Sequence, residues 1–176
     1  MSTKKPTFEE AVNAAMLWCK AWEEGELSDE VLADRVSELL TTNNGARGFF
    51  VISLASDCPL MDRLPESLVL QLREAGESVV NLTVKNLAMS SAIALHHKRQ
   101  KNTTQQAGSE LVTARCLELL RLLEPNKVKK RLEEILDAIK GQGTEQDVNF
   151  LQRWNYDDEQ KQAIAFSIYA IAESEH

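Results

Sequence analysis

The longest unbroken helical pattern in the chain runs from Glu77 to Gln100 and contains neither proline nor glycine. Apolar and small residues recur at helical spacing on one face and spread onto the neighbouring faces: Val80, Val84, Leu87, Ser91 and Leu95, with Val79, Leu82, Met89 and Ile93 beside them. A helix that is apolar on most of its circumference belongs inside a domain. We therefore expect residues 77–100 to form a central, mostly buried helix about 36 Å long.

The rest of the sequence divides into shorter helical patterns separated by turn residues. Capping boxes are predicted where Thr7 precedes Glu10 and where Asp157 precedes Gln160. Apolar spacing predicts helices over residues 8–24, 65–75, 144–153 and 157–172, and others begin at Ser28, Ser109 and Asn126. The last helix has many candidates for its packing surface: Ala163, Ile164, Phe166, Ile168, Tyr169 and Ile171. The sequence thus predicts an all-α, single globular domain of about eight helices over residues 1–176.

Phe49–Ala55 is ambiguous because its β-branched and aromatic residues suit a buried strand as well as a helix. A lone strand would leave its backbone amides without partners, and no second run of this kind exists. We therefore expect a helix over residues 46–55, capped by Asn44. Residues 41–48, rich in Asn and Gly, are interpreted as a loop whose end overlaps the start of this helix. Residues 1–6 are expected to be a disordered tail, and the polar residues 101–108 a mobile loop.

Composition narrows the class of protein. The chain has 43% hydrophobic and 27% charged residues, and no apolar run approaches the roughly 20 residues that cross a bilayer. With no secretory signal at the start, we expect a cytoplasmic protein that does not interact with a membrane. Its three cysteines have no spacing typical of disulfide frameworks or zinc sites, so we expect reduced, buried thiols.

Charge is distributed unevenly along the chain. Residues 98–131 carry 9 basic and 3 acidic side chains, whereas the net charge of the whole chain is −7. Seven basic residues form two groups in this segment: Lys98, Arg99 and Lys101, then Lys127, Lys129, Lys130 and Arg131. If the groups converge, they form a binding site for a small phosphate-bearing ligand; if acidic helices cover them, they only balance charge internally.

No pattern of residues indicates catalysis, a metal or a cofactor. His96 and His97 point about 100° apart on a helix and cannot chelate one ion together. The paired carboxylates lie where acidic residues favour helix starts, and no nucleophile, phosphate-loop or nucleic-acid motif is present. A polar line on the central helix, which includes Ser90, could face solvent, bond to neighbouring helices or line a pocket.

Trp18 and Trp22 form an i, i+4 ridge that suits either core packing or a partner's groove. The sequence therefore predicts a non-enzymatic, cytoplasmic helical interaction or regulatory module. Its partner is a protein or a second copy of the chain, with the tryptophan ridge pairing across a two-fold axis. The alternative is a domain, catalytic or not, that binds an anion through residues 98–131; nucleic acid is not expected as a partner.

Overall fold

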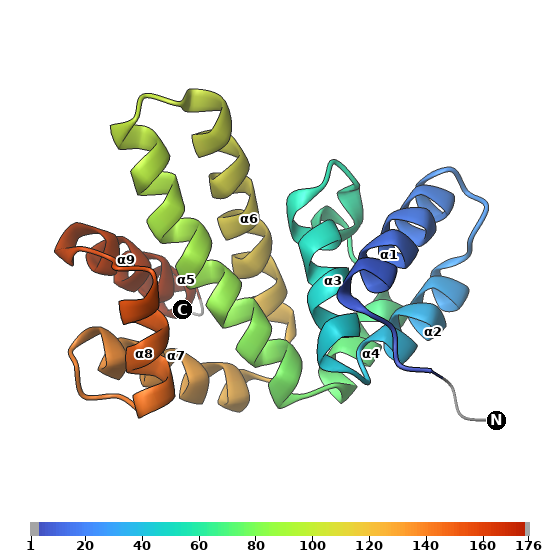
Figure 1. Ribbon diagram of the computed structural model, residues 1–176. Coiled ribbons are helices and arrows are strands. Elements are labelled where there is room, and N and C mark those ends of the chain that lie inside the picture. The colour runs from blue at the N-terminus through green and yellow to red at the C-terminus, as the bar shows by residue number, and fades with distance from the viewer. Residues whose placement is uncertain (1–3, 175–176) are drawn as a thin grey trace. The chain divides into compact units, whose positions relative to one another are not determined.

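All regular secondary structure in residues 4–174, the part that the computed structural model describes, is helical (Figure 1). This confirms the all-α prediction, including the helical state of Phe49–Ala55. That part contains a short 3-10 helix, Pro59–Asp62, and nine α-helices: α1 (Phe8–Glu23), α2 (Asp29–Leu39), α3 (Asn43–Ala55), α4 (Glu66–Glu74), α5 (Glu77–Arg99), α6 (Thr103–Leu122), α7 (Pro125–Ile139), α8 (Glu145–Arg153) and α9 (Asp158–Ser174).

The chain forms two compact units, residues 1–82 and residues 83–176, which we call the N-terminal and C-terminal units. The boundary falls inside α5, so the first turns of this helix belong to one unit and the remainder to the other. The expectation of a single domain over residues 1–176 stays a prediction.

In the N-terminal unit, α1 and α3 cross at close range. α1 presents the small side chains Ala11 and Ala15, both fully buried, and α3 presents Gly48. A Cβ atom built on Gly48 would lie 2.5 Å from the Cβ of Ala11 and 2.9 Å from the backbone nitrogen of Val12. The absence of a side chain at residue 48 is therefore what allows this crossing.

The start of α3 differs from the sequence prediction. The helix begins at Asn43, and the hydroxyl of Thr42, rather than Asn44, accepts a hydrogen bond from the backbone N–H of Gly45 at 3.0 Å. Thr42 lies one residue before the first helical turn, where a short hydroxyl side chain can bond to the third N–H of the helix. The Asn- and Gly-containing residues expected to form a loop are consequently the first turns of α3.

Two helix boundaries of the C-terminal unit also correct the sequence prediction. Residues 103–108 are helical, because the Asn102 side chain accepts a hydrogen bond from the N–H of Gln105 at 3.1 Å and caps α6. Lys101 adopts a left-handed conformation (φ 57°) that ends α5 and reverses the chain in a short turn. The helix expected from Asn126 instead has Glu124 as its cap and begins at Pro125. Of the expected disordered tail, residues 1–3 lie outside the described residues, and residues 4–6 are not helical.

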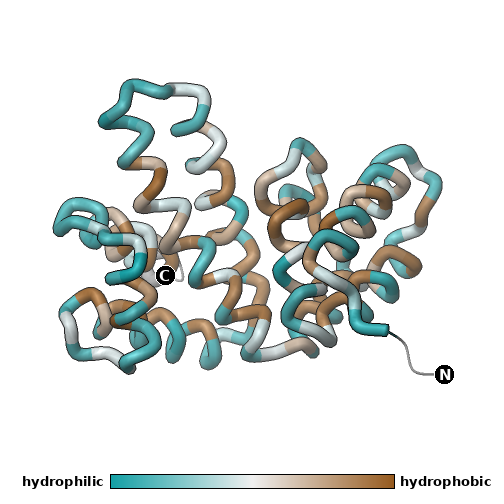
Figure 2. The backbone as a smooth tube through the Cα atoms, in the orientation of Figure 1, coloured by the Kyte–Doolittle hydropathy of each residue, from teal (hydrophilic) through white to brown (hydrophobic). Residues whose placement is uncertain are grey.

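α5 is the core helix of the C-terminal unit. Its Val84, Leu87, Ala88 and Ala92 side chains are almost completely buried. It is the one described helix whose length and composition would suffice to cross a membrane, and half of its apolar window is buried within the protein. Hydrophilic residues gather at its C-terminal turns and along the first turns of α6 (Figure 2).

Substitution by alanine should have opposite effects on the free energy of unfolding at Gly48 of α3 and at Gly108 of α6. Gly48→Ala should lower the free energy of unfolding by about 2 kcal/mol, because the added methyl group meets backbone atoms of α1. Gly108→Ala should raise it by about 1 kcal/mol, since residue 108 lies within α6 with nothing within 4 Å and alanine favours a helix. Urea denaturation of both variants measures this, and equal effects would contradict the tight α1–α3 crossing.

Candidate interaction site

Two buried serines of α5 connect it to the helices on either side. The hydroxyl of Ser90 lies 2.7 Å from that of Thr113 on α6, and the hydroxyl of Ser91 lies 2.7 Å from that of Ser167 on α9. Both serines also donate to the carbonyl oxygen of Leu87, at 3.2 and 2.7 Å. The sequence left open whether the polar side chains of α5 face solvent, bond to neighbouring helices or line a pocket. At Ser90 and Ser91 they bond to neighbouring helices.

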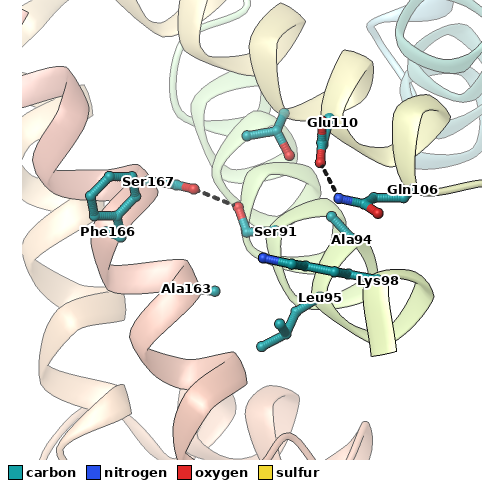
Figure 3. A pocket seen from close by; sticks show the side chains of 10 residues that line it. Ser91, Ala94, Leu95, Lys98, Gln106, Glu110, Ala163, Phe166 and Ser167 are labelled. Carbon is teal, nitrogen blue, oxygen red and sulfur yellow. Dashed lines mark hydrogen bonds between the residues drawn. The ribbon is translucent and has the colours of Figure 1, made fainter. Parts of the chain in front are cut away.

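A pocket of about 440 Å³ opens beside these hydroxyls, between α5, α6 and α9 (Figure 3). Gln106 and Glu110 line it from α6, where the amide of Gln106 donates a 2.7 Å hydrogen bond to the Glu110 carboxylate. Lys98 reaches from α5 toward α9. The other walls are mainly apolar: Ala94, Leu95, Ala163 and Phe166. An apolar hollow with one cation and one anion at its edge can bind an amphipathic partner.

Phe166 stands at the edge of this pocket with 78% of its surface exposed, more than any other large apolar side chain among the described residues. Tyr169, three residues further along α9, is 50% exposed. Ile164 and Ile168 form the buried face of the same helix, so Phe166 and Tyr169 point away from the core. We call Phe166, Tyr169 and the pocket together the Phe166 surface.

Sequence reasoning placed Phe166 and Tyr169 on the packing surface of the last helix, and the structure corrects this for both. The signal was available in their spacing. Ile164, Ile168 and Ile171 are separated by four and three residues and share one face, whereas residues 166 and 169 fall out of phase with them.

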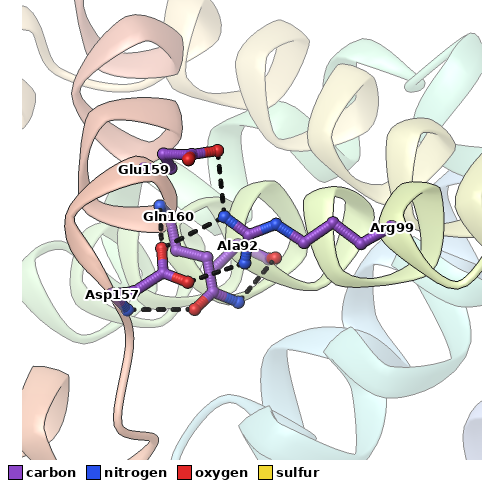
Figure 4. Close-up of polar contacts among 5 residues, drawn as sticks. All are labelled: Ala92, Arg99, Asp157, Glu159 and Gln160. Atoms are coloured by element: carbon purple, nitrogen blue, oxygen red, sulfur yellow. Dashed lines mark hydrogen bonds and ion pairs between the residues drawn. The ribbon is translucent and has the colours of Figure 1, made fainter.

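The start of α9 is fixed against the end of α5 by polar contacts (Figure 4). Asp157 and Gln160 form the predicted capping box, at 3.1 and 2.9 Å, and the Gln160 amide donates to the carbonyl oxygen of Ala92 at 3.2 Å. Arg99 donates to Asp157 at 2.6 Å and to Glu159 at 3.0 Å. The hydrogen bond from Arg99 is the main reason that the pKa of Asp157 lies below its usual value.

The seven basic residues do not form one cluster. Lys98 and Arg99 end α5, Lys101 lies in the turn before α6, and the second group lies in α7, which follows α6. α6 has 20 residues and is therefore about 30 Å long, which separates the two groups by roughly that distance. Because seven charges spread over both ends of a helix cannot contact one small ligand, a site formed by all of them is not available.

Within the second basic group, Arg131 forms an ion pair with Asp147 of α8. Two guanidinium nitrogens donate to the two carboxylate oxygens, both at 2.7 Å, and the side chains are only 13% and 6% exposed. These hydrogen bonds lower the pKa of Asp147, against the opposing effect of burial. Arg131, like Arg99, therefore balances acidic residues of the helices that follow it.

Lys127, Lys129 and Lys130 are exposed on the first turns of α7. A helix start can bind an anion through its N–H groups, but the Glu124 carboxylate already accepts from the N–H groups of Asn126 and Lys127, at 3.0 and 2.9 Å. The same bonds lower the pKa of Glu124. Binding of a phosphate-bearing ligand by these lysines stays a prediction.

Trp18 and Trp22 are half-buried and contact cationic side chains of the N-terminal unit. The guanidinium carbon of Arg35 lies 5.8 Å from the ring centroid of Trp18, and that of Arg63 lies 5.1 Å from that of Trp22. The indole nitrogen of Trp22 also donates to Asp29 at 2.7 Å. Both tryptophans therefore have partners within the unit, and the role of the ridge in binding a partner protein stays a prediction.

Among the described residues, no group of three or more His, Cys, Asp or Glu side chains is arranged to hold a metal ion. The rings of His96 and His97 are 5.6 Å apart at an angle of 61°, as expected for neighbours that diverge on a helix. The three cysteines are buried and form no disulfide, as predicted. Burial raises the pKa of Cys116 to about 12, so this thiol stays protonated.

Residues 7–171 of the chain match a protein family described as uncharacterised conserved protein UCP020893. The chain belongs to the UCP020893 family. The matched residues cover most of both units and every residue of the Phe166 surface. Neither a curated protein nor a solved structure matches the chain.

Replacing the aspartate by asparagine should destabilise the protein more in the Arg131–Asp147 pair than in the Arg99–Asp157 pair. Asp147→Asn should lower the free energy of unfolding by about 3 kcal/mol near pH 7, because Arg131 loses a mostly buried carboxylate partner. Asp157→Asn should have a much smaller effect, because its ion pair is exposed and asparagine still caps α9. Chemical denaturation of each variant measures both changes.

The Asp147 contribution should also depend on pH. Because the folded pKa of Asp147 is lowered, the pair stabilises the protein fully above the unfolded pKa of about 4. The contribution is lost as the pH falls through the folded value. The stability difference between the wild type and Asp147→Asn should therefore shrink below about pH 4. A difference that stays constant down to about pH 2 would contradict this assignment.

Proposed function

We propose that this chain is a non-enzymatic, cytoplasmic interaction module that binds a protein partner through the Phe166 surface. The observation that carries the proposal is an aromatic side chain, 78% exposed, at the edge of a 440 Å³ pocket. Large exposed apolar side chains beside a hollow with a polar edge are typical of protein interfaces, where aromatic residues contribute much of the binding energy.

Burial of the Phe166 side chain alone would contribute substantially to the affinity for a partner. Burying a phenylalanine side chain that is otherwise exposed contributes about 2 kcal/mol, which changes an affinity about thirtyfold. The pocket beside it can receive an apolar side chain of the partner, with Leu95 and Ala163 in its walls. Lys98 and Glu110 at the edge then favour partners with matching charges.

The polar groups of the pocket support binding more than catalysis. Glu110 accepts from Gln106, and Ser91 bonds to Ser167. A nucleophilic serine requires a base within hydrogen-bond distance, whereas the partner of Ser91 is another hydroxyl. These side chains bond to one another within and between the helices and so hold the shape of the pocket.

Site-specific photo-crosslinking tests this function. A benzophenone amino acid replaces Phe166 in the full-length chain, which is then produced in its native cells and irradiated. We expect a discrete crosslinked species, because the benzophenone lies within the interface. The matched control carries the same group at Leu70, which is 51% exposed on α4 but has Glu66 and Glu74 one turn away on either side.

A crosslinked species that forms at residue 166 and not at residue 70 supports the interaction function, and mass spectrometry identifies the partner. No species at residue 166, or the same set of species at both positions, would overturn it. Substitution of so exposed a side chain should leave the fold intact, which a circular dichroism melt of each variant checks.

A further inference from the structure

We propose that the partner bound by the Phe166 surface is a second copy of this chain, in a symmetric dimer. This inference rests on the interaction function proposed above and names its partner. A two-fold interface uses the same patch on both subunits, so the patch must be complementary to itself. The Phe166 surface meets this requirement in shape and in charge.

The shape is complementary because a projection and a hollow lie next to each other. Phe166 projects from α9 and at the same time forms one edge of the pocket. A copy rotated by 180° about an axis near Phe166 brings its own phenylalanine toward this pocket, and the first copy does the same in return. The apolar walls Leu95 and Ala163 would receive the incoming ring.

The charges are complementary because the pocket edge carries one of each sign. Lys98 comes from α5 and Glu110 from α6. In the symmetric arrangement, Lys98 of one copy faces Glu110 of the other, and this contact occurs twice. Two chains of net charge −7 repel each other at long range, so an interface between them needs a locally balanced patch of this kind.

Tyr169 extends the same surface by one turn of α9. It is 50% exposed and lies on the side of the helix that faces away from Ile164 and Ile168. Its ring can pack on the partner while its hydroxyl remains in contact with water at the edge of the interface. The dimer contact therefore follows α9 outward from the pocket.

Sedimentation equilibrium of the purified full chain, at concentrations up to about 100 µM, tests the dimer directly. The wild type should show a monomer–dimer equilibrium in this range. Phe166→Glu should raise the dimer dissociation constant at least about tenfold, because it places a charge at the centre of the interface. Leu70→Glu, a charge introduced at an exposed residue of α4, should leave the constant unchanged.

Charge reversal then tests the symmetry. Lys98→Glu and Glu110→Lys should each weaken self-association, because each variant faces like charges at both contacts. An equimolar mixture of the two variants should form a heterodimer, since both contacts between residues 98 and 110 would then join opposite charges. The double variant should form a homodimer again, because it exchanges the two charges and keeps them opposite. Recovery in the mixture and in the double variant is specific to reciprocal pairing, because a purely structural role of either residue would predict the loss in each single variant but not its rescue.

A wild type that remains monomeric to about 100 µM, or a Phe166→Glu variant that dimerises as well as the wild type, overturns the second-copy proposal. So does a mixture of the two charge variants that stays monomeric. The photo-crosslinking experiment separates this failure from that of the interaction function. A crosslink to a different protein would leave the function standing with another partner, and no crosslink at all would remove both.

Discussion

The hydrogen bonds of Ser90 and Ser91 are the constraint on which the C-terminal unit depends. Both serines are buried, and a buried polar group without a partner would cost several kcal/mol. Thr113 supplies the partner from α6 and Ser167 supplies it from α9. These two bonds join α6 and α9 to α5, and the pocket lies beside them, with Ser91, Thr113 and Ser167 in its lining.

Two arginines of the basic segment 98–131 have a structural role. Arg99 pairs with Asp157 and Glu159, and Arg131 pairs with Asp147, so each of these two arginines meets acidic side chains from the segment that follows. The guanidinium group suits this role because it donates several hydrogen bonds in fixed geometry. The lysines of the two basic groups, whose ammonium groups are more strongly hydrated, remain at the surface.

The sequence predicted those features that depend on local bonding. Both capping boxes, the helical state of Phe49–Ala55 and the extent of α5 follow from hydrogen bonds and periodicity within one segment. The Asn102 cap was also local, but the polar residues after it were interpreted as a loop. The exposure of Phe166 could have been predicted from its spacing, since it is out of phase with Ile164, Ile168 and Ile171. The roughly 30 Å between the basic groups depends on the length of α6, which the sequence-based prediction made too short by placing residues 101–108 in a loop.

Gly48 limits how this sequence can vary among its relatives. A larger side chain at residue 48 would ordinarily be compensated by a smaller one opposite, but residue 11 is already alanine. Even glycine at residue 11 would not make room, because the backbone nitrogen of Val12 would still lie 2.9 Å from the new Cβ atom. Any member of the UCP020893 family that keeps this crossing of α1 and α3 must therefore carry glycine at the position of residue 48, and one that lacks it must hold these two helices further apart.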